Sequence, residues 1–254
     1  MAAHDRPFSP HPGEGSMGDP QTERILREGT LHLEGEFLWG SNYTFLVRAV
    51  HPAGERLAVY KPRRGERPLW DFPEGSLAAR EVAAYVVSET LGWALVPLTV
   101  LRDDGPAGAG SLQEFLDLDF DRHYFSFTPE EKDRLRPAAL FDLLVNNADR
   151  KAGHILFGPD GHLWLIDHGI CFHPEDKLRT VIWDFAGQPI PASLLADIDR
   201  ARQSWTDSSP ARQQLEGLLS FDEVEALLQR AGHLLGHPVF PHPGPGRPFP
   251  WPLV

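Results

Sequence analysis

Cysteine is almost missing from this chain of 254 residues. Cys171 is the single cysteine, so a disulfide within the chain and a zinc site built from cysteines are both excluded. It stands between Ile170 and Phe172, where a cysteine is most simply interpreted as a small buried hydrophobic residue. The scarcity of cysteine also favours a cytoplasmic protein.

Long apolar runs and an excess of positive charge are absent as well. No stretch of about 18 apolar residues occurs, and residues 1–20 lack the apolar core of a signal peptide. We therefore expect neither secretion nor a membrane span. The formal net charge is -12, which disfavours a general binding surface for nucleic acid or anionic membranes.

Proline and glycine are abundant and collect at the two ends of the chain. Residues 1–22 combine Pro, Gly, His and charge without periodicity, and residues 237–254 alternate Pro with His, Gly, Phe and Trp. Both segments are typical of disordered or docked extensions. The length between them suffices for one large domain or two lobes with a substantial core.

The first half of the chain shows the alternation of β-strands. We expect strands at residues 31–37, 43–47 and 57–61, a helix from Ser76 to Leu91 that is capped by Ser76 and ends at Gly92, and two more strands at 95–101 and 111–116. This pattern predicts a small sheet with one prominent helix. Lys61 stands at the end of the third strand, and Glu81 lies within the helix.

From about residue 117 the pattern becomes helical. Residues 128–131 form a capping box, residues 135–145 continue as a helix with a break at Pro137, and further helices are expected at 192–202, 210–219 and 221–231. The exception is a β-hairpin with strands at 154–157 and 162–167 around a Gly-Pro-Asp-Gly turn. We therefore predict an α+β fold with flexible residues 1–22, an N-lobe at 23–116, a mainly helical C-lobe at 117–236 and a Pro/His-rich tail at 237–254.

Two acidic residues flank this hairpin and suit the binding of a metal-bound triphosphate. Asp149 lies in a polar loop before the hairpin, where a carboxylate can orient an acceptor hydroxyl or take its proton. Asp167 ends the second strand and offers carboxylate oxygen to Mg²⁺. Lys61 can reach the phosphates, while Glu81 can hold its ammonium group in an ion pair. Phosphoryl transfer needs this combination of charge neutralisation and positioning.

Several segments around these residues occur in a recognisable order. They are Asn147-Ala148-Asp149-Arg150, His154-Ile155-Leu156, Leu165-Ile166-Asp167-His168-Gly169, and Lys61 with the helix that carries Glu81. Together they resemble the catalytic and metal-binding loops of the phosphatidylinositol 3- and 4-kinase superfamily, and above all a group of actinobacterial proteins related to these lipid kinases. The resemblance covers roughly residues 30–190. It implies a bilobal protein-kinase-like fold with ATP between the lobes, Asp149 as catalytic aspartate and Asp167 as metal ligand.

Contacts with ATP are expected from three places. The candidates are Lys61, the turn residues Gly40, Ser41 and Asn42, and the hinge residues Gln113, Glu114 and Phe115. In the turn, which begins at Trp39, backbone amides can cover the phosphates. The position near the hinge is implied by the resemblance.

His154 departs from the family pattern. The family usually has an asparagine as its second metal ligand, and His154 occupies that position here. Since imidazole suits Mn²⁺ better than Mg²⁺, we expect either Mg²⁺ or Mn²⁺ as the metal. His154 is either a ligand of this metal or a structural histidine that hydrogen-bonds the loop.

The leading hypothesis is an ATP- and divalent-metal-dependent phosphotransferase that acts on a hydroxyl of an unknown protein or small molecule. Its catalytic residues would be Asp149, Lys61 and Glu81, and its metal ligands Asp167 and His154. One alternative is a pseudokinase that binds nucleotide or serves as a scaffold, which His154 and the single glycine of the turn favour. Another is an atypical transferase that moves AMP from ATP to a side chain.

Overall fold

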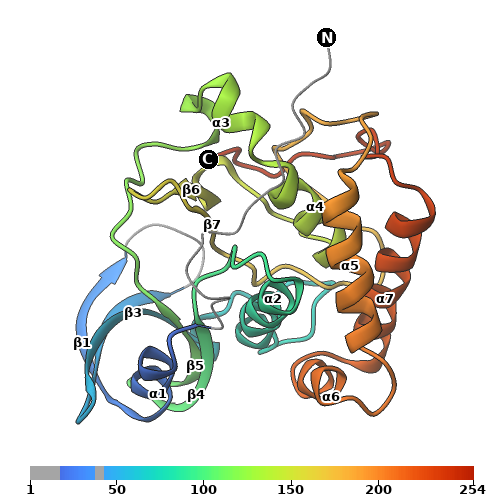
Figure 1. Ribbon diagram of the computed structural model, residues 1–254. Coiled ribbons are helices and arrows are strands. Elements are labelled where there is room, and N and C mark those ends of the chain that lie inside the picture. The colour runs from blue at the N-terminus through green and yellow to red at the C-terminus, as the bar shows by residue number, and fades with distance from the viewer. Residues whose placement is uncertain (1–17, 38–42) are drawn as a thin grey trace.

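The computed structural model describes residues 18–37 and 43–254. Its elements are α1 (Pro20–Glu28), β1 (Thr30–Phe37), β2 (Thr44–His51), β3 (Gly54–Pro62), η1 (Arg63–Gly65), α2 (Leu77–Leu91), β4 (Thr99–Gly105), β5 (Gly108–Glu114), η2 (Tyr124–Ser126), α3 (Pro129–Asp133), α4 (Arg136–Val145), η3 (Ala152–His154), β6 (Ile155–Phe157), β7 (Leu163–Leu165), α5 (Ala192–Ser204), α6 (Pro210–Glu216) and α7 (Phe221–Gly236). Figure 1 shows the first five strands at one end and α4, α5 and α7 at the other, with α2 between them. The expected α+β architecture, β-rich first and helical second, is confirmed.

The strands β1 to β5 form one antiparallel sheet in the order β1-β2-β3-β5-β4. Strand β4 starts at Thr99, later than expected, because residues 95–97 do not join the sheet. The amides of Leu95 and Val96 donate instead to the hydroxyl of Ser88 on α2, at 2.8 and 3.3 Å. Pro97, which follows them, has no amide hydrogen to offer a neighbouring strand.

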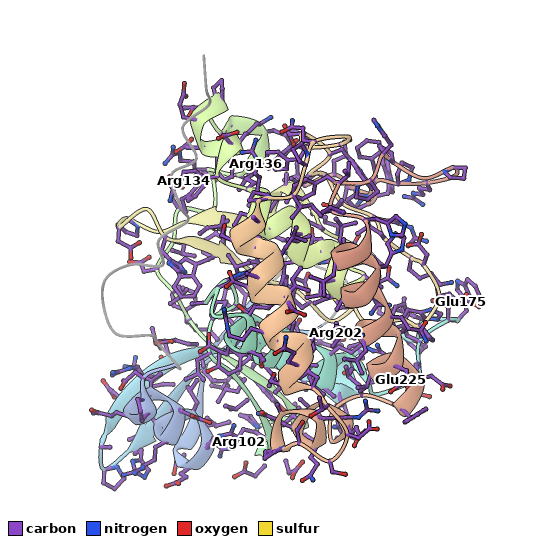
Figure 2. All side chains as sticks on the ribbon, turned by 45° about the vertical axis from the view of Figure 1, so that its right-hand side comes forward. Arg102, Arg134, Arg136, Glu175, Arg202 and Glu225 are labelled. Carbon is purple, nitrogen blue, oxygen red and sulfur yellow. The ribbon has the colours of Figure 1, made fainter. Side chains whose placement is uncertain are left out.

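Helix α1, which the sequence patterns did not indicate, packs against the sheet. Asp19 caps its start by accepting hydrogen bonds from the amides of Gln21 and Thr22, at 3.2 and 3.1 Å. Arg102 of β4, at the sheet end of the molecule (Figure 2), donates to the carbonyl of Leu26 at 2.7 Å near the end of the helix. Residues 20–22, expected to belong to a flexible extension, are therefore part of the folded chain.

Helix α2 lies between the sheet and the helical part. Gly92 ends it as expected, with a φ of 74° and a ψ of 21°, the left-handed conformation that glycine adopts without strain. Its start differs from the expectation, because the Ser76 hydroxyl donates to the carbonyl of Pro73 at 2.6 Å and caps nothing. The carboxylate of Glu66 accepts from the first helical amides in its place, at 3.3 Å for Leu77 and 3.0 Å for Ala78.

The helical part follows the predicted pattern with one correction. Pro137 does not break a helix; it lies in the first turn of α4, where a missing amide hydrogen costs nothing. The capping box of Thr128 and Glu131 and the hairpin of β6 and β7 form as expected. A large apolar core joins α2, α4, α5, α7 and this hairpin, and a smaller core lies between α1 and the sheet.

The C-terminal tail, residues 237–254, is docked on the helical part. The amide of Phe240 donates to the carbonyl of Gln188 at 2.9 Å. The carbonyl of Pro248 accepts from the amide of Thr180 at 3.1 Å. Of the two expected states, disordered or docked, the structure shows the docked one.

Within residues 18–37 and 43–254, none of the helices has both the length and the apolar character of a membrane span.

Candidate nucleotide and phosphotransfer site

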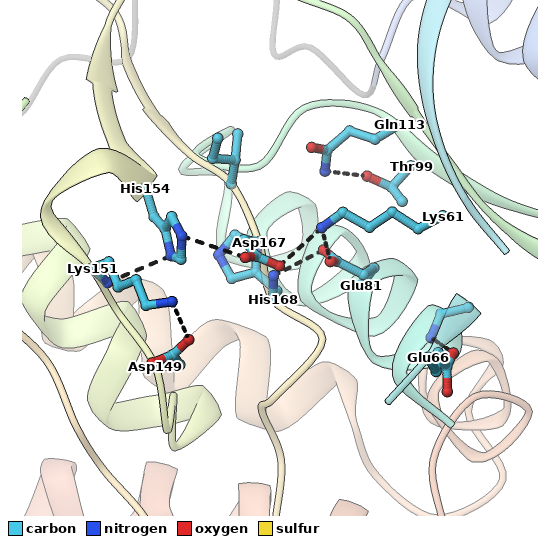
Figure 3. A network of polar contacts seen from close by, with 12 residues as sticks. Lys61, Glu66, Glu81, Thr99, Gln113, Asp149, Lys151, His154, Asp167 and His168 are labelled. Atoms are coloured by element: carbon cyan, nitrogen blue, oxygen red, sulfur yellow. Dashed lines mark hydrogen bonds and ion pairs between the residues drawn. The ribbon is translucent and has the colours of Figure 1, made fainter. Parts of the chain in front are cut away.

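Lys61, Glu81 and Asp167 come together although they are far apart in the sequence. Lys61 is near the end of β3, and its ammonium group contacts the carboxylate of Glu81 on α2. The same nitrogen lies 2.9 Å from Oδ1 of Asp167, just beyond β7 (Figure 3). The pairing of Lys61 with Glu81, predicted from their order and spacing, is therefore present, and Asp167 joins it.

The charges of this cluster are set by burial and by the short contacts. Burial alone would lower the pKa of Lys61, but Asp167 and Glu81 outweigh it and raise that pKa. Desolvation opposes ionisation of Asp167, yet Lys61 holds the pKa of this carboxyl well below its usual range. Burial raises the pKa of Glu81, while Lys61 counteracts it. At neutral pH Lys61 and Asp167 thus carry full charges, and the half-exposed Asp167 carboxylate faces solvent.

The backbone at Asp167 is bent in a way that connects this strand end to α2. Asp167 has a φ of 61°, a left-handed conformation that costs a residue other than glycine about 1–3 kcal/mol. The bend presents the amide of His168 to Oε2 of Glu81, at 2.9 Å. Glu81 therefore binds the Lys61 ammonium with one oxygen and the His168 backbone with the other.

Asp149 lies in the loop before the hairpin, and Lys151 neutralises part of its charge. The side chain of Asn147 accepts a hydrogen bond from the Asp149 amide at 2.9 Å and so fixes the loop. Nζ of Lys151 lies 3.1 Å from Oδ2 of Asp149. Burial raises the pKa of Asp149, an effect that Lys151 opposes. A carboxylate in this setting can orient a hydroxyl and take its proton.

His154 stands next to Asp167, as the hypothesis of a shared metal requires. Its Nε2 lies 3.4 Å from Oδ2 of Asp167. Burial lowers the pKa of His154 to about 4, so the ring is neutral at pH 7. Its Nδ1 accepts a long contact of 3.5 Å from the Lys151 amide. A metal bound through Nε2 would require the ring hydrogen on Nδ1, which would give up this weak contact.

These donors fit a divalent cation that is also bound by phosphate. Among the described residues, no group of three or more His, Cys, Asp or Glu side chains is arranged to hold a metal. Mg²⁺ in nucleotide sites is commonly held by one or two carboxylates together with substrate phosphates. Asp167 with the neutral ring of His154 matches such a site, and the imidazole favours Mn²⁺.

Arg150 lies beneath the site and is fully buried. Its Nε donates to the carboxylate of Asp142 at 3.0 Å, and its remaining nitrogens donate to the carbonyl of Ile166 at 2.8 Å and to Nε2 of His168 at 2.7 Å. Because these bonds use the guanidinium inside the protein, Arg150 does not face a substrate. It joins α4, the Asp149 loop and the end of β7 into one unit.

A known protein matches almost the whole of this chain. No protein-family model matches the chain. Protein Rv2133c from Mycobacterium tuberculosis (strain ATCC 25618 / H37Rv) is 41% identical over 264 aligned positions, and the alignment covers 90% of this chain and 94% of Rv2133c. The chain belongs to the Rv2133c family. This match confirms the expected relation to actinobacterial proteins.

Two further likenesses involve kinases. Phosphatidylinositol 4-kinase gamma 4 from Oryza sativa subsp. japonica is 35% identical over 130 aligned positions, and the alignment covers 43% of this chain but only 22% of the plant protein. The crystal structure of the Helicobacter pylori proinflammatory kinase CtkA has a TM-score of 0.50 and 13% sequence identity, and covers 85% of this chain and 94% of that one. The structural likeness confirms the expected bilobal kinase-like fold.

The expected ATP contacts outside the cluster remain predictions in this member of the Rv2133c family. The side chain of Gln113 donates to the Thr99 hydroxyl at 2.9 Å, above Lys61 (Figure 3). The amides of Glu114 and Phe115 are used within the sheet, where they donate to the carbonyls of Leu98 and Leu57 at 2.8 and 3.0 Å. The turn residues Gly40, Ser41 and Asn42, like Trp39 before them, lie outside the described residues.

Two residues of the site were missing from the sequence-based prediction. The sequence-based prediction gives Lys151 no role, although a lysine two positions after the candidate catalytic aspartate is a visible signal. It also gives no role to Asp142, which lies within the expected helix, because no local pattern marks this residue. Its role appears only when Arg150, eight residues later, turns inward to meet it.

Proposed function

We propose that this Rv2133c-family protein is an ATP- and divalent-metal-dependent phosphotransferase that acts on a hydroxyl group. The observation that carries the proposal is the contact of one ammonium group, Lys61 Nζ, with the carboxylates of both Glu81 and Asp167. An ion pair between surface residues contributes little to stability. Stability alone therefore does not explain why one lysine contacts two carboxylates from different parts of the chain. A lysine held between the sheet and the Asp167 turn is suited to bind phosphates.

The site residues divide the work of phosphoryl transfer among them. Lys61 would neutralise charge on the ATP phosphates, and Glu81 would hold its ammonium in place. Asp149 would orient the acceptor hydroxyl and receive its proton. The acceptor oxygen forms a bond to the γ-phosphorus while the bond from this phosphorus to the bridging oxygen of ADP breaks.

A divalent cation held by Asp167 and His154 would neutralise charge on the phosphates when it is bound. Lys151, which pairs with Asp149 in the structure, adds a second positive charge beside the acceptor position. The site thus combines cations for the phosphates with a carboxylate for the acceptor, and this distribution of charge supports a phosphotransferase.

Turnover of ATP tests the proposal directly. Wild type should release ADP in the presence of Mg²⁺ or Mn²⁺. Asp149→Asn should lower the rate by about 10²- to 10⁴-fold, because the group that takes the proton is lost. Asp167→Asn should lower it by at least about 100-fold, because a carboxylate that holds charge near the phosphates is lost. Mass spectrometry of the products would distinguish transfer of phosphate from transfer of AMP.

Asp103→Asn is the matched control for these variants. Asp103 is an exposed carboxylate on β4, and its substitution makes the same change of charge outside the candidate site. It should leave the rate unchanged. Equal rates in wild type, Asp149→Asn and Asp167→Asn with both metals would contradict the proposal.

His154 favours a second candidate, a pseudokinase that binds nucleotide without transferring phosphate. The ring is neutral and lies 3.4 Å from Asp167, at the position of the second metal ligand. His154→Asn separates the two candidates, because an amide oxygen suits Mg²⁺ whereas imidazole suits Mn²⁺. In a phosphotransferase the variant should shift the preferred metal toward Mg²⁺. Nucleotide binding with no turnover in either protein would favour the pseudokinase.

A further inference from the structure

A pocket of about 280 Å³ lies beside the loop that carries Asp149. Three segments distant in sequence form its wall: η2, residues 181–184, and the C-terminal tail. The lining residues are Tyr124, Phe125, Val181, Trp183, Asp184, Phe249 and Leu253. Four of these carry aromatic rings, one carries a carboxylate, and no lining residue carries a positive charge.

Backbone hydrogen bonds join two walls of this pocket to the candidate catalytic loop. The amide of Val181 donates to the carbonyl of Arg150 at 3.2 Å, one residue after Asp149. The carbonyl of Leu253 accepts from the amide of Ala152 at 2.8 Å. Figure 1 shows the C-terminus next to β6, the strand that follows this loop. A ligand in the pocket therefore lies next to the loop that carries Asp149, on the side where the C-terminal tail contacts this loop.

The carboxylate of Asp184 is held at the aromatic wall. The Tyr124 hydroxyl donates to its Oδ2 at 2.6 Å. Burial and the hydrogen bond to Asp184 both raise the pKa of Tyr124, so the phenol remains a donor. Asp184 is exposed and has no ion-pair partner among the described residues, so its negative charge is available to a ligand.

Aromatic faces with a nearby carboxylate bind organic cations. The ring quadrupole attracts an ammonium group over the ring face, and the attraction grows when water is excluded. One ring of the wall already shows this contact: the ammonium of Lys132 lies 4.3 Å from the centroid of Tyr124. The net charge of -12 adds a field that draws cations toward the protein.

We propose that this pocket binds the alkylammonium group of a small acceptor molecule whose hydroxyl reaches Asp149. The proposal rests on the phosphotransferase function and adds the chemical class of the acceptor. A pocket of this size holds the cationic end of a small molecule, while the rest of the acceptor extends along the loop toward Asp149. The aromatic rings select for an apolar cation, and Asp184 selects for its charge.

Saturation-transfer NMR without ATP tests the binding part. The probe is tetramethylammonium, and tert-butanol is its neutral analogue of similar shape. Wild type should bind the cation in preference to the alcohol. Asp184→Asn keeps an oxygen for the Tyr124 hydroxyl but removes the charge, and should weaken cation binding about three- to tenfold. Phe125→Leu keeps an apolar side chain but removes a ring, and should weaken it by a similar factor.

Asp103→Asn makes the same change of net charge on the sheet and should bind the cation as wild type does. Circular dichroism would show that each variant is folded. Equal binding of tetramethylammonium and tert-butanol would overturn the proposal. So would equal affinity for the cation in Asp184→Asn, Phe125→Leu and Asp103→Asn.

ADP release with a panel of acceptors tests the link to the reaction. Amino alcohols with alkylated nitrogen should stimulate release more than diols of matched length, and Phe125→Leu should reduce this preference. Stimulation by both classes alike would refute the acceptor class while leaving the phosphotransferase intact. Cation binding in protein that never turns over ATP would refute the phosphotransferase and leave an ammonium-binding pocket.

Discussion

Glu81 and Glu89 stand on the same helix, about two turns apart. Glu81 is buried, whereas Glu89 is half-buried. Glu81 is compensated by Lys61 and by the amide of His168. Among the described residues, no cation forms an ion pair with Glu89, and burial raises its pKa to about 7, against an ordinary value of 4.5. The amide of Gly18 only partly opposes this shift. A glutamate on α2 therefore contributes to the candidate site at position 81 and destabilises the folded chain at position 89.

Glu89→Gln should make the protein more stable at high pH. Below pH 4.5 the carboxyl is neutral in both folded and unfolded chains, so it costs nothing. As the pH rises from 4.5 to about 7, the unfolded chain ionises first and the folded state loses stability. Allowing for partial exposure, we expect the variant to gain about 1–2 kcal/mol at pH 8 and almost nothing at pH 4.

Urea unfolding of wild type and Glu89→Gln at both pH values measures this gain. Glu74→Gln makes the same substitution at an exposed carboxyl in the loop before α2 and serves as the control, with little effect on stability expected. An equal effect of the two substitutions at pH 8 would show that burial of Glu89 does not destabilise the folded chain.

At the scale of elements, α2 is tied to α7 by a buried ion pair. Arg80, which precedes Glu81, contacts the carboxylate of Glu223 and donates to the carbonyl of Cys171 at 2.6 Å. Cys171 itself is fully buried, as the sequence suggested. Glu223 also accepts from the Ser220 amide at 2.8 Å and so caps α7. Through Arg80, the helix that positions Glu81 is anchored to the end of the molecule opposite the sheet.

Arg80→Met should cost about 3–5 kcal/mol of unfolding free energy, because it leaves Glu223 buried without its cation. Combining Arg80→Met with Glu223→Gln should cost less than the sum of the two single changes, since the two residues interact directly. Arg27→Met, which breaks an exposed pair with Glu23, should cost under about 1 kcal/mol. Chemical denaturation gives all four values; a similar cost for Arg80→Met and Arg27→Met would disprove the anchoring role.

At the scale of the whole molecule, the candidate site joins two apolar cores. Lys61 comes from the sheet that covers the smaller core, and Asp167 follows the hairpin that belongs to the larger one. Their contact at 2.9 Å is a direct connection between these parts. A ligand that binds both residues therefore binds the native chain and not the unfolded one, and must raise the apparent stability.

ATP with Mn²⁺ should raise the melting temperature by about 5–10 °C when the nucleotide is present at about 100 times its dissociation constant. Lys61→Met should lose most of this shift, because the cation for the phosphates is gone. Arg27→Met, a change of equal charge on the exposed face of α1, should keep it. Differential scanning fluorimetry measures the effect, and the absence of a shift with either Mg²⁺ or Mn²⁺ would indicate a protein that does not bind nucleotide.

Much of the local structure follows from the sequence alone. Alternation of apolar residues and turn chemistry predicted the strands β1 to β3, the end of α2 at Gly92 and the hairpin of β6 and β7, because neighbouring residues decide these features. The order of Lys61, Glu81, Asp149 and Asp167 identified the candidate site. Helix α1 was missed because its cap at Asp19 stands next to a segment without periodicity.

Only the tertiary structure decided which side chains meet. Whether Arg150 turns inward to Asp142 or outward to a substrate depends on a buried partner that no local pattern marks. The contact of Lys61 with Asp167 joins residues 106 positions apart, and the pocket beside Ala152 exists because the tail folds back onto the loop. Apolar alternation and turn chemistry involve residues that are close in the sequence. The burial and pairing of charged side chains depend instead on how distant segments pack.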